Sequence, residues 1–103
     1  MRQTYARAIP RAWKQTARLF VALGEPHRQR ILLMFEPGEE LTVGQIVAAS
    51  TLSRSAVAHH LKVLRAAGVL RNQKVGKEVW YRTEPAAVRT ALQSVLDYIG
   101  ANC

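Results

Sequence analysis

Residues 41–83 limit the choice of fold more than any other part of the chain, because they combine two helix starts with a hairpin signal. Thr42 opens a T-x-x-Q capping box, which predicts a short helix that runs to Ala49. A turn follows, and Ser53 then stands where a helix cap is expected, before an apolar-periodic segment over residues 54–67. The sequence therefore predicts two helices joined by a tight turn.

A β-hairpin is expected directly after the second of these helices. Gly68 stands where a helix commonly ends in a left-handed residue. Residues 69–74 and 78–83 are typical of strands, and Gly76 marks the turn between them. Two helices joined by a tight turn and followed by a hairpin form a winged helix-turn-helix, whose second helix fits the major groove of DNA.

Three further helices are expected to complete the domain. Residues 10–23 and 26–35 form the first two, and Glu84-Pro85 opens the last. The predicted fold class is mainly α with a small β-hairpin, a winged helix-turn-helix in the order α-α-α-α-β-β-α. Residues 1–103 are interpreted as one DNA-binding domain, in which residues 1–9 form an arm.

The first and last helices both carry apolar stripes. A domain of this length has little stability to spare, so an exposed stripe favours burial against a second copy of the chain. Packing of the two helices against each other within one chain is the alternative. The stripe residues are Trp13, Ala17, Phe20 and Val21 on the first helix, and Val88, Leu92, Val95, Leu96 and Ile99 on the last.

The chain is strongly basic, with 15 Lys and Arg against 7 Asp and Glu and a formal net charge of +8. Such an excess favours polyanionic partners through counterion release, without sequence preference. The charge is concentrated over residues 50–82, where seven basic residues stand against Glu78 alone. A winged helix that binds only a protein partner has no need of this charge, so double-stranded DNA is the expected partner.

The helix over residues 54–67 has two distinct faces. At about 100° per residue, Val57, Leu61 and Leu64 share the face expected to enter the core. The opposite face mixes small and hydrogen-bonding side chains, which suits a close approach to base edges, although an ordinary solvated face is the alternative. The expected DNA-binding residues are Arg54, Ser55, Ala58, His59, Lys62 and Arg65 on this helix, and Lys74 and Lys77 on the hairpin.

The aromatic and histidine residues are assigned mainly to packing. His59 and His60 diverge by about 100° on a helix, so one metal ion cannot easily bind both. His60 lies near the core-facing edge and is expected to pack or to bond to backbone, whereas His27 is expected to be a surface or capping residue. Of Trp80 and Tyr81, one is expected to pack inside while the other shields the sheet.

Three motifs resemble the ArsR/SmtB family of bacterial winged-helix repressors, over roughly residues 13–99. They are FVALGEPHRQRILLMF, SRSAVAHHLKVLRAAGVL and GKEVWYR. The resemblance implies a homodimer, built through the first and last helices, that binds a palindromic operator and represses transcription. It also implies DNA contacts at Arg54, Ser55, Ala58 and His59, and phosphate contacts at Lys74 and Lys77.

The chain departs from the family at both of its common metal sites. The family's thiol motif in the third helix is replaced by LTVGQ, and the last helix contains Asp97 but no His. Neither a metal nor another cofactor is therefore expected. Cys103 is the single cysteine and fits a reducing cytoplasm. An unidentified small-molecule inducer, a redox signal through Cys103, and control by protein abundance all stay open.

Other classes of protein fit the sequence less well. No constellation for nucleophilic or acid–base catalysis is evident, so the chain is not expected to be an enzyme. No apolar run approaches the roughly 20 residues needed to span a bilayer and no export signal is apparent, so a cytoplasmic location without membrane contact is expected. The remaining alternatives are a winged-helix protein-interaction module and a non-specific nucleic-acid-binding protein.

Overall fold

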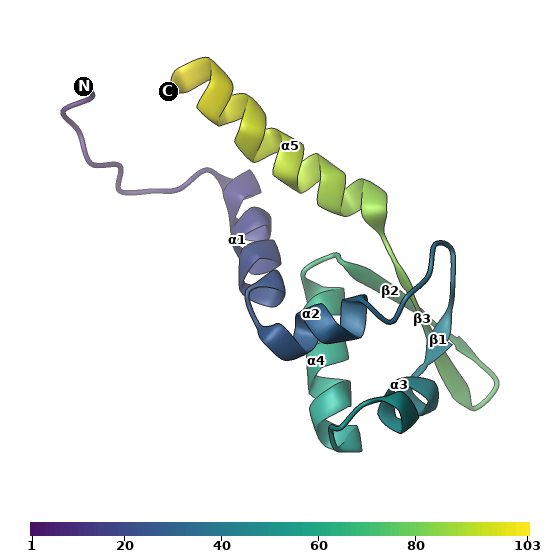
Figure 1. Cartoon of the computed structure of the whole chain (residues 1–103). Coiled ribbons are helices and arrows are strands. Elements are labelled where there is room, and N and C mark those ends of the chain that lie inside the picture. Colours follow the sequence, from purple (N-terminus) through teal and green to yellow (C-terminus); the bar gives the residue numbers. More distant parts are fainter.

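Helix α4 (Arg54–Ala66) lies at the centre of the fold, since α1, α2, α3 and strand β2 all pack against it (Figure 1). The computed structural model describes residues 1–103. Its other elements are α1 (Arg11–Leu23), α2 (Pro26–Leu32), β1 (Leu41–Thr42), α3 (Val43–Ala49), β2 (Leu70–Val75), β3 (Glu78–Thr83) and α5 (Pro85–Asn102). The mainly helical winged helix-turn-helix class predicted from the sequence is confirmed.

Both ends of α4 are fixed by its neighbours in sequence, as predicted. The Ser53 side chain accepts a hydrogen bond from the backbone N–H of Ala56 at 3.2 Å. At the other end, Gly68 has φ +80° and its N–H donates to Arg65 O, while Val69 N–H donates to Leu64 O. This pair of bonds is a Schellman motif, and it turns the chain from the helix directly into β2.

The core forms around the inward face of α4. Val57, Leu61 and Leu64 are fully buried, as their spacing predicted. They pack with residues from α1, α2, α3 and the sheet, among them Tyr81, while Trp80 is half-buried on the neighbouring position of β3. The prediction that one ring of this pair packs inside and the other lies nearer the surface of the sheet is therefore confirmed. The buried apolar residues are Leu19, Ala22, Ile31, Ile46, Val57, Leu61, Leu64, Ala67, Val69, Leu70 and Tyr81.

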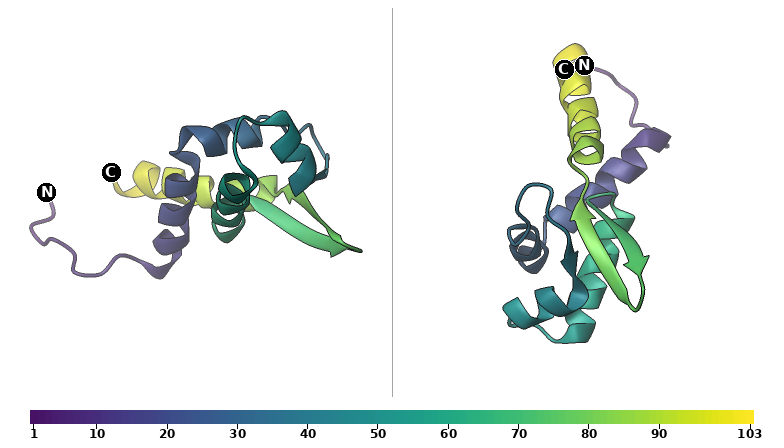
Figure 2. Two further views of the ribbon diagram at one scale, coloured as in Figure 1. Left: turned by 90° about the horizontal axis from the view of Figure 1, so that it is seen from below. Right: turned by 90° about the vertical axis from the view of Figure 1, so that its right-hand side faces the viewer.

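The sheet has three strands, not the two that were predicted. Strand β1 pairs antiparallel with β3, so the order is β1-β3-β2 and the element order becomes α-α-β-α-α-β-β-α. A strand of two residues is too short to show an alternating pattern, and its partner lies about 40 positions further along the chain, which is why sequence inspection missed it. The β2–β3 hairpin extends beyond β1 and projects from the molecule (Figure 2).

Two helix boundaries also differ from prediction. Helix α2 ends at Leu32 and not at Phe35, because the next backbone bonds span three residues, from Met34 N–H to Ile31 O and from Phe35 N–H to Leu32 O. This tightening replaces the last expected turn of the α-helix. Helix α4 ends at Ala66, one residue short of the prediction, where the Schellman geometry begins.

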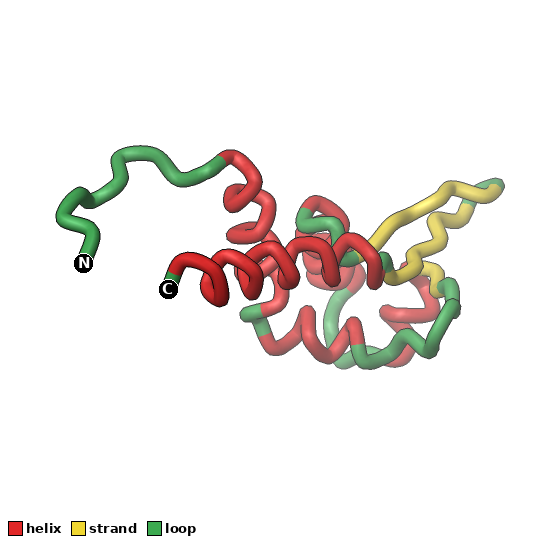
Figure 3. Tube along the Cα trace, turned by 90° about the horizontal axis from the view of Figure 1, so that it is seen from above, coloured by secondary structure: helices red, strands yellow, loops and turns green.

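Helices α1 and α5 extend away from the winged part, and the longest dimension of 54 Å runs from the N-terminal segment before α1 to the tip of the hairpin (Figure 3). The rings of Trp13 in α1 and Tyr98 in α5 meet edge to face, with their centroids 4.9 Å apart. The face of α1 that enters the core carries Thr16, Leu19 and Ala22, so most of its predicted apolar stripe stays exposed. Helix α5 contains no buried residue.

We expect Gly68→Ala to lower the free energy of unfolding by about 1–2 kcal/mol, because alanine is disfavoured at a left-handed φ. A Cβ there meets only Gln15 Nε2, at an ordinary 3.6 Å, so backbone strain dominates the cost. Gly100→Ala is the matched control: it lies in helical backbone with open space around it and should be neutral or stabilising. Urea unfolding measures both, and equal effects would contradict the assigned C-cap.

Candidate nucleic-acid interface

The outer face of α4 is accessible along its whole length. All six contact residues predicted on this helix are exposed, with the small side chain of Ala58 between polar ones. No other element covers this face, so α4 can enter a groove of DNA as a recognition helix. The six residues are Arg54, Ser55, Ala58, His59, Lys62 and Arg65.

The fold brings the start of α4 and the tip of the hairpin together. Arg54 and Lys77 line one depression of about 190 Å³, whose floor includes Val43 and Gly44 from the start of α3. Gly76 has φ +63°, which confirms the tight turn predicted at the tip. Glu78 lines the same depression, so Arg54 and Lys77 leave it with a net positive charge that favours the approach of a duplex.

Arg65 and Lys74 are placed differently from the residues at the start of α4. The Arg65 guanidinium donates a hydrogen bond to Asn72 Oδ1 at 3.4 Å, so it ties the end of α4 to β2. Lys74 is exposed on β2 opposite Val79 of β3, with no ion-pair partner in the structure. Both stay candidates for phosphate contacts, but Arg65 also has a structural partner within the protein.

The turn between α3 and α4 is held by its own serines. The Ser50 hydroxyl donates to Val47 O and accepts from Leu52 N–H, both at 3.2 Å. The predicted capping box at the start of α3 is confirmed, with reciprocal bonds between Thr42 and Gln45 at 3.1 and 2.9 Å. This turn therefore fixes the angle between the two helices without needing a ligand.

Sequence inspection missed a buried arginine behind the recognition helix. Arg28, only 9% exposed, donates from Nε to Ala22 O at 2.8 Å and from Nη2 to Val21 O at 3.2 Å. Both acceptors are carbonyls in the last turn of α1. Its Nη1 lies 3.3 Å from His60 Nδ1 on α4. One guanidinium thus joins α1, α2 and α4.

Glu25 and His60 complete this junction. Glu25 caps α2 by accepting from Arg28 N–H at 2.9 Å, and its Oε2 lies 3.9 Å from His60 Nδ1. Burial acts to raise the pKa of Glu25, but the Arg28 N–H bond and the neighbouring cationic groups outweigh it and leave that pKa below its usual value. Burial is the main cause that lowers the pKa of His60, against the opposite effect of Glu25.

The two histidine predictions fare differently. His60 packs as expected, since its side chain is only 13% exposed, but its hydrogen-bond partner is the side chain of Arg28 and not the backbone. His27 is half-buried and does not cap α2, because Glu25 does; its ring lies 5.9 Å from that of His60. The three rings still offer no metal centre, since no three His, Cys, Asp or Glu side chains are grouped around a common point.

The residues present do not fit the family's metal sites either. The segment at α3 has no thiol, and α5 has Asp97 as its one acidic residue after Pro85, bonded to Gln93 at 2.7 Å. Cys103 is free and exposed at the last residue of the chain. None of these groups provides a set of ligands for a soft metal ion.

The fold and its basic outer face define the chain as a winged helix-turn-helix protein, and comparisons identify the family. The family model "Bacterial regulatory protein, arsR family" matches residues 25–72. Among solved structures, an ArsR-like transcriptional regulator from Rhodococcus sp. RHA1 superposes with a TM-score of 0.75 and 30% identity, over 86% of this chain and 82% of that one. The chain belongs to the arsR family of bacterial regulatory proteins.

Two curated relatives are named as transcriptional repressors. A repressor SmtB homolog of Synechocystis sp. is 33% identical over 84% of this chain, and the match spans 64% of the length of that protein. The repressor SdpR of Bacillus subtilis is 26% identical over 79% of this chain and 89% of its own length. Family membership places the chain among regulatory proteins and not among enzymes, as predicted.

The structure contains no helix that combines the length and the apolar character needed to cross a membrane.

We expect Ser53→Ala to change stability and Ser55→Ala to change DNA binding. Ser53 caps α4, so its loss should lower the free energy of unfolding by about 1 kcal/mol. Ser55 bonds only to the Ser53 hydroxyl, at 3.2 Å, so its loss should leave stability nearly unchanged and weaken DNA binding. Urea unfolding and fluorescence anisotropy on labelled duplex DNA separate the two effects, and reversed results would overturn the assignment of the exposed face.

Proposed function

We propose that the protein is a sequence-specific DNA-binding transcriptional repressor that acts as a homodimer on a palindromic operator, without the family's usual metal sites. The observation that carries the proposal is the exposed outer face of α4 beside the basic hairpin tip, where Arg54 and Lys77 share one depression. A helix of 13 residues that is capped at both ends and open on one face suits the major groove.

The two terminal helices support the dimer. Val88, Ala91 and Val95 of α5 are half-buried against the rest of the chain, whereas the next stripe, Leu92, Leu96 and Ile99, is exposed. On α1, Phe20 and Val21 remain 50% and 67% exposed. Apolar stripes of this kind on two adjacent helices favour burial against the same surface of a second copy.

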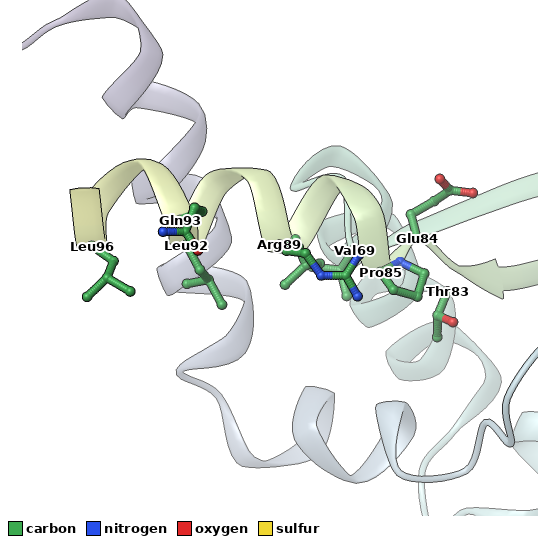
Figure 4. A pocket seen from close by; sticks show the side chains of 9 residues that line it. Val69, Thr83, Glu84, Pro85, Arg89, Leu92, Gln93 and Leu96 are labelled. Atoms are coloured by element: carbon green, nitrogen blue, oxygen red, sulfur yellow. The ribbon is translucent and has the colours of Figure 1, made fainter. Parts of the chain in front are cut away.

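The exposed stripe of α5 borders an open groove of about 440 Å³ (Figure 4). Leu92 and Leu96 point into the open space beside the helix, and Val69, between α4 and β2, also lines the groove. Val69, Val88, Leu92 and Leu96 give this groove its apolar surface, and Glu84 and Arg89 also line it. A two-fold dimer that covers it would present its two α4 helices to successive major grooves about 34 Å apart.

Selection of bound sequences from random duplex DNA at about 150 mM salt tests the proposal. We expect one inverted repeat to be enriched, with two half-sites one helical turn apart. Enrichment of a single half-site without symmetry would reject the dimeric mode of binding. Tight binding without enrichment would favour a non-specific nucleic-acid-binding protein, and no binding at all would favour a protein-interaction module.

Arg54→Ala should weaken binding to the selected duplex by about tenfold or more and reduce its preference over a scrambled duplex. His59→Ala should act in the same direction. Lys77→Ala should weaken binding to both duplexes and flatten the slope of log affinity against log salt by about one unit for each phosphate that the variant leaves unneutralised. Anisotropy titrations at several salt concentrations measure these effects, and unchanged discrimination by Arg54→Ala would reject α4 as the reading helix.

Leu96→Glu should convert the dimer to a monomer, because it places a charge on the exposed stripe of α5, where Leu96 is 63% exposed. Leu33→Glu is the matched control: Leu33 is 85% exposed after α2 and lies outside both stripes. Sedimentation equilibrium reports the mass of each variant. A dimer that survives Leu96→Glu and not Leu33→Glu would place the interface elsewhere.

A further inference from the structure

We propose that Arg28 and His60 form a positioning pair for the recognition helix. A neutral His60 ring accepts a hydrogen bond from Arg28 and so sets the orientation of α4 relative to α1 and α2. When that ring is protonated, its Nδ1 exchanges Arg28 for Glu25 as its hydrogen-bond partner, and sequence-specific binding of DNA becomes weaker. This inference rests on the proposed function, which it extends by naming how the reading helix is held and what releases it.

The chemistry of the two groups dictates the direction of the bond. A guanidinium has only N–H donors and keeps its proton in proteins, so the group that faces Arg28 Nη1 at 3.3 Å has to be an acceptor. His60 Nδ1 can accept only in the neutral ring, with the proton on Nε2. The geometry therefore assigns one protonation state and one tautomer to His60 in the folded protein.

The surroundings of His60 favour this neutral state. Its side chain is 13% exposed, and burial, Arg28, His59 and His27 all lower its pKa, while Glu25 alone raises it. Helix α3, which packs against α4 on another side, contains no titratable residue. The neutral ring is therefore the form that the folded chain stabilises near pH 7.

Glu25 provides a second partner for the same ring atom. Its Oε2 lies 3.9 Å from His60 Nδ1, so a protonated ring needs to approach by about 1 Å to donate a charge-assisted hydrogen bond. The same Oε2 now accepts from Arg28 N–H and caps α2. A proton taken up from solvent would thus break the Arg28–His60 bond and draw the capping carboxylate towards α4.

The position of Arg28 explains why this exchange would act on specificity. Its other donors hold Val21 O and Ala22 O at the end of α1, the helix proposed to form the dimer. The Arg28–His60 bond therefore connects the dimer surface to the reading helix. A tilt of α4 would misplace two recognition helices relative to two half-sites, while non-specific phosphate contacts tolerate such a tilt.

The first test follows binding against pH. Anisotropy titrations with the selected duplex and a scrambled duplex, between about pH 5 and pH 8, give the ratio of specific to non-specific affinity. We expect this ratio to fall by about fivefold or more as the pH is lowered. Circular dichroism at each pH checks that the chain stays folded.

Four variants assign the titrating group. His60→Gln keeps an acceptor for Arg28 and cannot be protonated, so it should retain the ratio measured at pH 8 and lose the pH dependence. His60→Leu removes the acceptor and should lower the ratio at every pH. His59→Gln and His27→Gln should keep the pH dependence, although His59→Gln binds DNA more weakly. A pH dependence that survives in His60→Gln, or that disappears in His59→Gln, would overturn the proposal.

The second test needs no DNA. Ring ¹⁵N–¹H correlation spectra of the full chain should show His60 as the neutral Nε2–H tautomer near pH 7, with a pKa below that of an unfolded histidine. An Nδ1–H tautomer would overturn the positioning pair. If the selection enriches no sequence, the proposed function fails, while this tautomer still decides whether Arg28 and His60 are bonded as inferred.

Discussion

Burial of the Val57, Leu61 and Leu64 face of α4 is the interaction on which the rest of the structure depends. Helices α1, α2 and α3 and strand β2 all pack against this helix. Because the inward face is fully buried, the outward face is fixed in direction and stays exposed. The same packing that forms the core of this small chain thereby presents the candidate DNA-reading surface.

Local sequence signals predicted what depends on near neighbours. The capping box at Thr42, the cap at Ser53 and the left-handed turn at Gly68 each need only residues within one helical turn, and all three are present in the structure. The buried face of α4 was predicted for the same reason, since a helical period relates positions close in sequence. The apolar stripe of α1 was visible too, because it follows the same helical period.

Features that depend on distant partners were not predictable in this way. Strand β1 exists only because Leu41 and Thr42 meet Tyr81 and Trp80. Arg28 stands in a polar segment of the sequence, and its burial arises only because the end of α1 offers two carbonyls to its guanidinium. The shared depression of Arg54 and Lys77 likewise requires the hairpin to fold back beside α4. Such arrangements follow from tertiary packing, and the periodicity of apolar residues in the sequence does not reveal them.

The short length of β1 has a mechanical consequence for the hairpin. Only Tyr81 and Trp80 of β3 have a neighbour on that side, so the part nearer to Gly76 is a two-stranded ribbon that is largely exposed, apart from Val79, which packs against the core. Two-stranded ribbons twist more than wider sheets and are marginally stable on their own. The rigid helix and the compliant ribbon therefore have different roles: α4 meets a groove of fixed dimensions, while the ribbon can bend to follow a backbone whose groove width varies with base sequence.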